Sequence, residues 1–258
     1  MFNSKKKANP KNDDGSMGLV DHLAELRKRI TVIILSALIG FVLCFTFASR
    51  LVNYVADMAI GFGYDLVYLA PTELFMQYIK VGILGAIVIM SPVILYEIWA
   101  FLSPGLTTNE KKALLPALFF GLFCFVVGAA FSYKIMLPFM LQFFFNVNTS
   151  SDIAASISVE NYLNFILSAV LTFGITFELP VVIAILTQFG LVRPELLKKG
   201  RKIAIVLIFL VGALITPPDI TSQIMVALPM IVLYQISILV SSVIDRKRKR
   251  KEEGEENG

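Results

Sequence analysis

The stretch LNFILSAVLTFGITFELPVVIAILTQF spans residues 163–189 and decides the class of fold. Glu178 is its only charged residue, so the run is apolar over its whole length. At about 1.5 Å per residue, a helix of this length extends beyond the roughly 30 Å apolar core of a bilayer. The stretch therefore predicts a helix that crosses a membrane, with one acid near its centre.

The whole chain shares this apolar character. Of its 258 residues, 57% are hydrophobic and 16% are charged, against roughly 45–50% and about 25% in soluble domains. So few charged side chains cannot cover a soluble protein, which excludes an ordinary soluble enzyme. His22 is the single histidine, and the two cysteines, Cys44 and Cys124, lie inside apolar runs. We therefore expect neither a metal site nor a cofactor, and we interpret the cysteines as inert thiols.

Five further apolar runs occupy residues 30–49, 74–100, 113–131, 203–215 and 224–244. The run of 13 residues at 203–215 is short, because a span needs about 20 residues of helix. It lies between two strongly basic segments that should both face the cytoplasm. The intervening chain must cross twice or form a re-entrant hairpin, and we favour two short spans.

The basic residues also predict the orientation. Of the 23 lysines and arginines, 20 lie in the first 29 residues, in the connections at 100–112 and 190–202, and in the tail that follows residue 245. The positive-inside rule then predicts an all-α, polytopic plasma-membrane protein with six transmembrane helices, both termini cytoplasmic and the last two helices short.

The two tails differ from the membrane domain at 17–245. Residues 1–16 are rich in Lys, Asn and Asp, and residues 246–258 are densely charged, so both are predicted to be disordered cytoplasmic tails. The basic start of the second tail, beside a membrane, favours contact with anionic lipid rather than nucleic acid. Residues 19–30, LVDHLAELRKRI, have apolar positions at helical spacing and predict an amphipathic helix on the cytoplasmic face, before the first span.

Three acids stand out in this chain. Glu25 lies one helical turn before Arg29, which allows an ion pair within a solvated helix. If Glu25 and Glu110 converge, the two carboxylates could instead bind a pair of arginines through bidentate hydrogen bonds. Glu178 lies about 3 Å from the centre of its run, where an acid costs on the order of 2.5–3.5 kcal/mol. It is either a structural acid satisfied within the bundle or a residue that faces a cavity or a partner, and Pro180 predicts a distorted helix beside it.

The turn between the two short spans is rich in proline. Pro217 and Pro218 restrict the backbone, and Asp219 is predicted to cap the following helix. Thr216 and Gln223 lie at the ends of these spans, where polar groups can bond to a neighbouring membrane helix. Elsewhere, Glu97 and Trp99 near the end of the second run are predicted to be interfacial anchors.

Four strings occur in order along the chain: HLAELRKR (22–29), SPVILYEIWAFLSPGLTTNEKK (91–112), FGITFELPVV (173–182) and TPPDITSQ (216–223). In these motifs, and over about residues 19–243, the sequence resembles TatC, the core receptor of the twin-arginine protein translocase. The resemblance implies a non-enzymatic receptor that binds twin-arginine signal peptides of folded proteins. It also implies export driven by the proton gradient, and no nucleotide-binding GxxxxGK[ST] loop is present in the sequence.

The resemblance also implies roles for individual residues. Glu25 and Glu110, with Arg27 and Phe101 nearby, would form the cytoplasmic surface that recognises the twin-arginine motif. The family commonly has an aromatic residue where this chain has Thr107, which affects the packing of that loop.

Within the membrane, Glu178 would face a concave polar pocket and contact a pore-forming partner. Thr216 and Gln223 would belong to the site where the single helices of TatA-type or TatB-type subunits dock, in a complex that holds several copies of the chain. Gln235 stands where relatives often have Glu. Without the four strings, a proton-coupled small-solute transporter with Glu178 as proton carrier would rank first.

Overall fold

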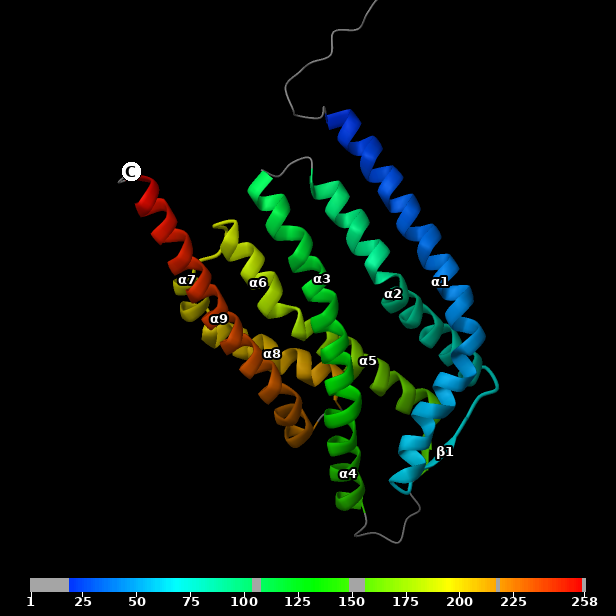
Figure 1. Ribbon diagram of the computed structural model, residues 1–258. Coiled ribbons are helices and arrows are strands. Elements are labelled where there is room, and N and C mark those ends of the chain that lie inside the picture. Colours follow the sequence, from blue (N-terminus) through cyan, green and yellow to red (C-terminus); the bar gives the residue numbers. More distant parts are fainter. Residues whose placement is uncertain (1–18, 104–107, 149–155, 217–218, 257–258) are drawn as a thin grey trace, which may run out of the picture.

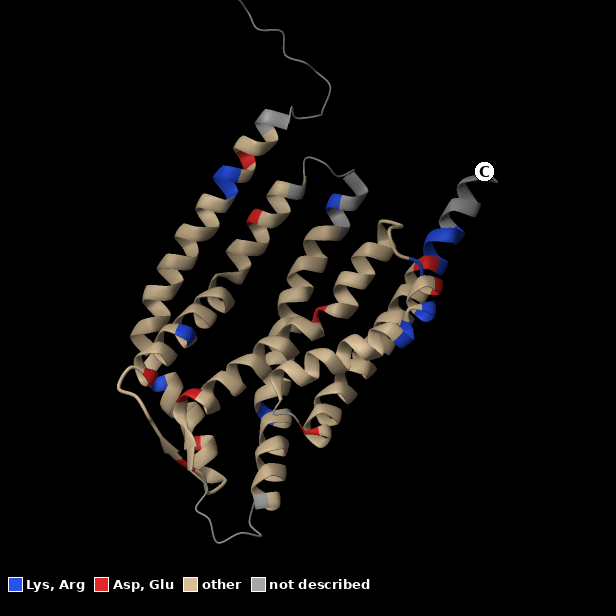
Figure 2. Cartoon of the chain, turned by 180° about the vertical axis from the view of Figure 1, so that it is seen from behind, with Lys and Arg blue, Asp and Glu red and all other residues tan. Residues whose placement is uncertain are grey.

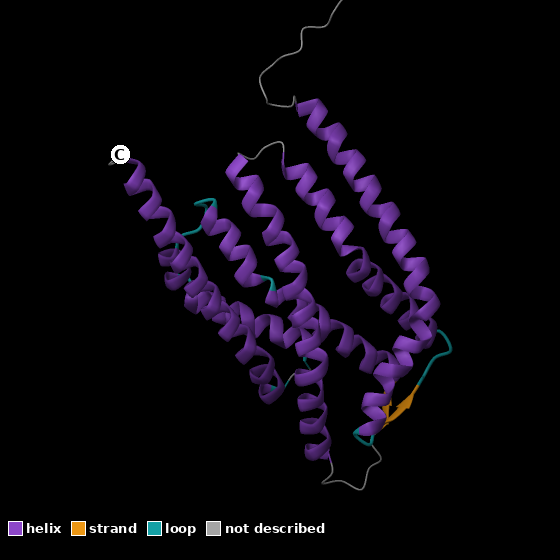
Figure 3. Ribbon diagram, in the orientation of Figure 1, coloured by secondary structure: helices purple, strands orange, loops and turns teal. Residues whose placement is uncertain are grey.

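The computed structural model describes residues 19–103, 108–148, 156–216 and 219–256. The chain is almost wholly helical (Figure 3). The predicted disordered tail at 1–16 and the turn residues Pro217 and Pro218 lie outside the described residues. The elements are α1 (Leu19–Gly61), β1 (Asp65–Val67), α2 (Glu73–Leu102), α3 (Thr108–Phe131), the π-helical turn η2 (Ser132–Met136), α4 (Leu137–Asn148), β2 (Ser156–Ser158), α5 (Val159–Phe177), α6 (Leu179–Gln188), α7 (Pro194–Lys199), α8 (Arg201–Ile215) and α9 (Ile220–Glu256).

Five helical stretches of the described chain are long and apolar enough to cross a membrane. Each contains one of the apolar runs found in the sequence. The remaining run lies in α8, whose 15 residues cover about 22 Å, less than the roughly 30 Å apolar core. The stretches are His22–Gly61, Glu73–Phe101, Leu114–Val147, Val159–Gln188 and Ile220–Arg250.

Several helices are longer than the sequence predicts. The prediction that the last two helices are both short is correct for α8 and wrong for α9, which has 37 residues. Residues 19–30 do not form a separate surface helix before the first span, because they begin the single 43-residue helix α1. No proline or glycine occurs between residues 19 and 39 to interrupt it.

The C-terminal tail is also helical where disorder is predicted. Helix α9 continues to Glu256, through most of the segment 246–258. Lysine, arginine and glutamate have high helix propensity, so a charged composition does not by itself end a helix. The i,i+4 ion pair between Asp245 and Lys249, at 2.9 Å, stabilises the start of this extension.

The long helices share a common orientation in Figure 1. The start of α1, the end of α2, the start of α3 and the ends of α6 and α9 lie at one end of the bundle, which we call the upper end. The end of α1, strand β1 and the end of α4 lie at the opposite, lower end. Charged residues gather toward the ends of the helices, and the middle of the bundle is mostly uncharged (Figure 2).

Helices α1 and α2 form a closely packed antiparallel pair (Figure 1). Gly40 of α1 lies against Ala86 of α2, and Gly85 of α2 lies against Cys44 of α1. Small residues let two helix backbones approach in a membrane, where packing drives association. The pair therefore brings the first turns of α1 next to the last turns of α2.

A polar group lies inside the bundle between α2 and α5. Lys80 donates a hydrogen bond to Asn164 Oδ1 at 2.8 Å, and the fully buried Gln77 donates to the same oxygen at 3.3 Å. Lys80 also lies 3.8 Å from Glu160. Polar residues in apolar surroundings are stabilised by such mutual contacts, which here join the two helices.

The lower end contains the only sheet of the described residues. Strands β1 and β2 pair in parallel, with Leu66 opposite Ile157. Glu73 accepts hydrogen bonds from the Leu69 amide and from Ser158, which caps α5. These contacts tie the start of α5 to the connection between α1 and α2.

Candidate functional site

Three charged residues meet at the upper end of the α1–α2 pair. Arg29 donates one hydrogen bond to Glu97 at 2.9 Å and a second to Glu25 at 3.0 Å. The side chains are 24%, 10% and 16% exposed, respectively. One guanidinium thus bridges two carboxylates in a partly dry setting, where charge-assisted hydrogen bonds are strong.

The antiparallel packing of α1 and α2 creates this arrangement. Arg29 directly precedes the first apolar run, and Glu97 lies near the end of the second, so the antiparallel pairing brings them within 2.9 Å of each other. The ion pair within α1 between Glu25 and Arg29 is present as predicted from their spacing. Glu97, interpreted from sequence as an interfacial anchor, is instead a direct partner of Arg29. The signal that could have identified it is an acid and a base at matching positions in two adjacent apolar runs.

An aromatic contact borders the three charges. The rings of His22 and Phe101 are stacked, with centroids 4.5 Å apart and planes inclined by 18°. Phe101 therefore lies beside the start of α1, while Arg27 points to an exposed face. The backbone of Glu110 lies in the first turn of α3, but its side chain and Thr107 are outside the described residues.

Glu25 keeps part of its hydrogen-bonding capacity. Its Oε2 atom is buried, and no described residue bonds to it. A carboxylate can accept several hydrogen bonds, so one more donor would satisfy this oxygen. Glu25 and Glu97 carry two negative charges against the single positive charge of Arg29. The cluster of Glu25, Arg29 and Glu97 therefore has the charge and the free acceptor needed to bind a further cation.

Glu178 lies at a break within a membrane-spanning stretch. Helix α5 ends at Phe177 and α6 begins at Leu179, which confirms the distortion predicted at Pro180. Its carboxylate lies against α3, where a Cβ added to Gly121 would be 2.6 Å from Oε2. Among the described residues, none forms a hydrogen bond or an ion pair with that carboxylate. The half-buried acid is thus held between helices without a polar partner from the described chain.

The other predicted site residues lie at the lower end of α8 and α9. Asp219 accepts a hydrogen bond from the Ser222 amide at 2.7 Å and caps α9. Gln223 donates to the Phe209 carbonyl at 2.8 Å, and buried Thr216 donates to the Gly212 carbonyl at 3.0 Å. Of these bonds, the one from Gln223 to Phe209 joins α9 to α8, whereas the other two lie within the end of α8 and the start of α9.

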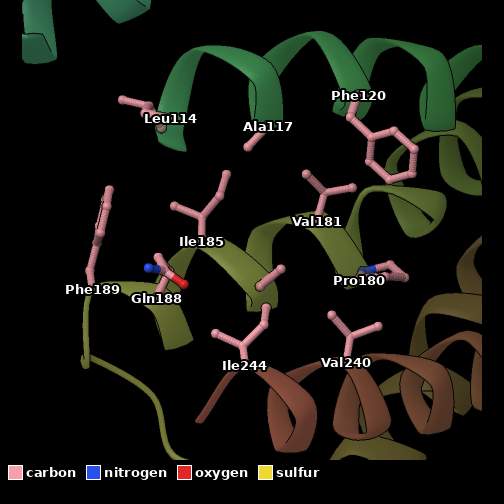
Figure 4. A pocket seen from close by; sticks show the side chains of 11 residues that line it. Leu114, Ala117, Phe120, Pro180, Val181, Ile185, Gln188, Phe189, Val240 and Ile244 are labelled. Carbon is pink, nitrogen blue, oxygen red and sulfur yellow. The ribbon is translucent and has the colours of Figure 1, made fainter. Parts of the chain in front are cut away.

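An apolar groove of about 260 Å³ opens between α3, α6 and α9 (Figure 4). In Figure 4, Ala117 and Phe120 of α3 face Val181 and Ile185 of α6 across it. The groove is lined almost wholly by apolar side chains, with Gln188 as its polar residue. Sequence reasoning did not identify this groove, because its walls come from three distant parts of the chain.

Comparison with known proteins identifies the family. The sequence model of the family described as Sec-independent protein translocase protein (TatC) matches residues 21–229. The chain belongs to the TatC family. A TatC protein of Helicobacter pylori is 42% identical over 240 residues, covering 93% of this chain and 94% of the relative. The TatC protein of Aquifex aeolicus is 38% identical, with 90% and 98% covered, and the TatCy protein of Bacillus subtilis is 36% identical, with 91% and 92% covered.

A solved structure supports the same assignment. A crystal structure described as the twin arginine translocase receptor TatC matches with a TM-score of 0.78 and 37% identity. It covers 86% of this chain and 99% of the matched chain. This member of the TatC family is therefore a multi-pass membrane component of a Sec-independent protein translocase. That assignment favours protein transport over the small-solute transporter considered from Glu178 alone.

The bridge between Arg29 and Glu97 should contribute measurably to the stability of this TatC protein. We expect Arg29→Gln and Glu97→Gln each to lower the free energy of unfolding. Arg29→Gln leaves the carboxylates of Glu25 and Glu97 without their cation, and Glu97→Gln leaves Arg29 with Glu25 as its one charged partner in the cluster. Their effects should be non-additive by about 1–3 kcal/mol in a double-mutant cycle. Reversible unfolding in mixed detergent micelles measures this coupling. The cycle of Arg27→Gln with Glu97→Gln is the control, since Arg27 is exposed on the same helix. Additive effects in the first cycle would contradict the bridge.

Proposed function

We propose that this protein is the receptor of a twin-arginine translocase and that the cluster of Glu25, Arg29 and Glu97 belongs to its signal-binding surface. The observation that supports this is the pairing of one guanidinium with two carboxylates at the upper end. The surface already holds an arginine in the way in which a signal arginine would be held. A matched solved structure is described as a twin arginine translocase receptor.

The chemistry of the cluster favours arginine over lysine in the signal. A guanidinium presents its donors in a planar fork that fits a carboxylate bidentately, whereas an ammonium acts as a point charge. The buried Oε2 of Glu25 is the acceptor for the incoming group. Glu110, in the first turn of α3 just beyond the end of α2, would supply a carboxylate for the other arginine of the signal. Phe101 and Arg27 flank this surface.

The proposed receptor crosses the membrane six times, with its upper end in the cytoplasm. Helix α8 is the short fifth span, and the bilayer thins locally to accommodate it. Both termini then face the cytoplasm, in agreement with the concentration of lysine and arginine at the upper end. The basic end of α9 would contact anionic lipid.

The membrane part of the receptor gathers partner subunits. TatA-type and TatB-type single helices would dock at Thr216 and Gln223, beside the end of α8 and the start of α9, since polar groups there can exchange their bonds for bonds to a neighbouring helix. Glu178 would contact a partner from within the bundle, and several copies of the chain would share the complex. The proton gradient would supply the energy for export of folded proteins.

Signal binding should depend on the arginine pair and on Glu25. A twin-arginine signal peptide should bind the purified protein at least tenfold more tightly than its twin-lysine version, a difference of about 1.4 kcal/mol. Glu25→Gln and Glu110→Gln should each weaken binding of the arginine form about tenfold or more, because each removes a charge-assisted hydrogen bond. Fluorescence anisotropy of a labelled peptide in detergent measures both effects.

The control for these variants is Asp57→Asn, which removes an exposed acid from the lower part of α1. It should leave peptide binding unchanged. Equal affinity for the arginine and lysine peptides, or unchanged binding by both glutamine variants, would rule out the proposed surface.

The six-span topology predicts that the turn before α9 faces away from the cytoplasm. A cysteine introduced at exposed Thr221, in a variant without Cys44 and Cys124, should react with a membrane-impermeant maleimide added outside intact cells. A cysteine at exposed Lys198 should react only after the cells are opened. Labelling of the Thr221 cysteine only from the cytoplasmic side would favour a re-entrant hairpin.

Glu178 should matter as a polar contact rather than as a proton carrier. We expect Glu178→Ala to reduce export of a folded reporter several-fold and Glu178→Gln to retain most of it, because an amide preserves hydrogen bonding without titrating. Both variants should bind the signal peptide normally, since Glu178 lies far along the bundle from Glu25. Export assays in cells, normalised to protein level, measure the difference. If Glu178→Gln is as inactive as Glu178→Ala, a role in proton transfer is favoured instead.

A further inference from the structure

A second cavity, of about 620 Å³, lies at the upper end on the far side from the α1–α2 pair. It is formed by the turn after α6, by α7 and by the end of α9. Of the described side chains that line it, four are cationic and one, Glu195, is acidic; the cations are Arg193, Lys199, Arg248 and Lys249. We call it the basic cavity. Asp245 pairs with Lys249 at 2.9 Å. Among the described lining residues, cations therefore outnumber acids.

One cation of the basic cavity is fixed by the fold. Arg248 donates a hydrogen bond to the Thr187 carbonyl at 3.4 Å, and Thr187 in turn bonds to Ser241 of α9 at 2.8 Å. Gly190 has a φ of +74°, and a Cβ there would lie 2.5 Å from Nη1 of Arg248. The absence of a side chain at this turn leaves room for the guanidinium against the backbone. The positive charge is therefore held at the end of α6 by the packing of α6 on α9.

The basic cavity lies at the edge of the membrane-spanning part. The stretch Val159–Gln188 ends two residues before Gly190, and the stretch Ile220–Arg250 ends just after Lys249. The apolar runs 163–189 and 224–244 also end shortly before these cations, so we place them near the level where lipid headgroups meet the apolar core. Basic pockets between transmembrane helices at this depth bind acidic lipid headgroups.

Residues that line the apolar groove of Figure 4 are followed closely along the chain, in two places, by residues that line the basic cavity. Phe189 of the groove directly precedes Gly190, and Ile244 of the groove lies one helical turn before Arg248. Figure 4 shows Ile244 and Val240 along α9 on the groove side. A charged cavity followed by an apolar groove is complementary to a ligand with an anionic head and a hydrocarbon chain.

From this juxtaposition we infer that the protein binds one acidic phospholipid, with its phosphate-bearing headgroup in the basic cavity and an acyl chain in the apolar groove. Arg193, Lys199 and Arg248 bind the headgroup, and Ala184 and Ile185 contact the chain. The inference depends on membrane insertion but not on signal-peptide binding. A discrete site of this kind differs from general attraction of the basic end of α9 to an anionic bilayer.

The test uses the full chain, purified in a non-ionic detergent, with short-chain phosphatidylglycerol as the probe. Native mass spectrometry measures bound lipid, and phosphatidylcholine with the same chains is the reference. We expect one phosphatidylglycerol per chain, bound at least fivefold more tightly than phosphatidylcholine. The double variant Arg193→Gln, Lys199→Gln should lose most of this preference. The matched double variant Lys198→Gln, Lys202→Gln removes the same charge from the same segment, outside the cavity lining, and should keep it.

A second arm tests the groove. Ala184→Leu should fill it and weaken phosphatidylglycerol binding several-fold, whereas glycerol 3-phosphate and inorganic phosphate alone should compete poorly with the lipid. Removal of the acidic residues 252–258 should leave lipid binding unchanged. Monodisperse elution and an unchanged helical circular dichroism spectrum show that each variant is folded. This test can therefore succeed or fail independently of the receptor proposal.

Three results would overturn the inference. Equal losses in the two double variants would mean diffuse attraction rather than a site. Binding of inorganic phosphate as tight as that of the lipid would remove the role of the groove. A large gain in lipid binding when residues 252–258 are removed would identify the acidic tail as the occupant of the cavity.

Discussion

One constraint governs the rest of the structure: the apolar core of a bilayer contains no water that could form hydrogen bonds with backbone amides. A helix satisfies its own N–H and C=O groups, which is why the chain spans the membrane in long helices and confines its short strand pair to the lower end. The two irregularities inside the apolar stretches are small. The π-helical turn at Ser132–Met136 keeps α3 and α4 continuous, and the break at Glu178 is followed directly by α6.

The same constraint governs where charge is found. Charges inside the bundle occur in contact with partners, as with Lys80 and Asn164, or at a helix break, as with Glu178. At the upper end, the cluster of Glu25, Arg29 and Glu97 places three charges at the edge of the apolar core, where partial burial strengthens their hydrogen bonds.

The upper end has two chemically different surfaces. The acidic cluster lies on α1 and α2, and the basic cavity lies between α7 and α9, with α3 and α6 between them (Figures 1 and 2). The two surfaces therefore differ in the charge that they present, although they lie at the same end of the bundle.

The sequence by itself determined the all-helical membrane class, the five long apolar stretches, the break near Pro180 and the ion pair of Glu25 with Arg29. These follow from local properties: the length of apolar runs, the spacing of residues within one helix and the cost of an acid in hydrocarbon. The continuity of α1, the full length of α9 and the length of the α3–α4 stretch were missed, because apolar runs mark the membrane core and not where a helix ends. Only the tertiary structure decided the bridge from Arg29 to Glu97, the contact of Glu178 with Gly121, and the apolar groove between α3, α6 and α9. Each of these joins residues far apart in the chain, and their proximity depends on how helices pack side by side, which no single run of sequence specifies.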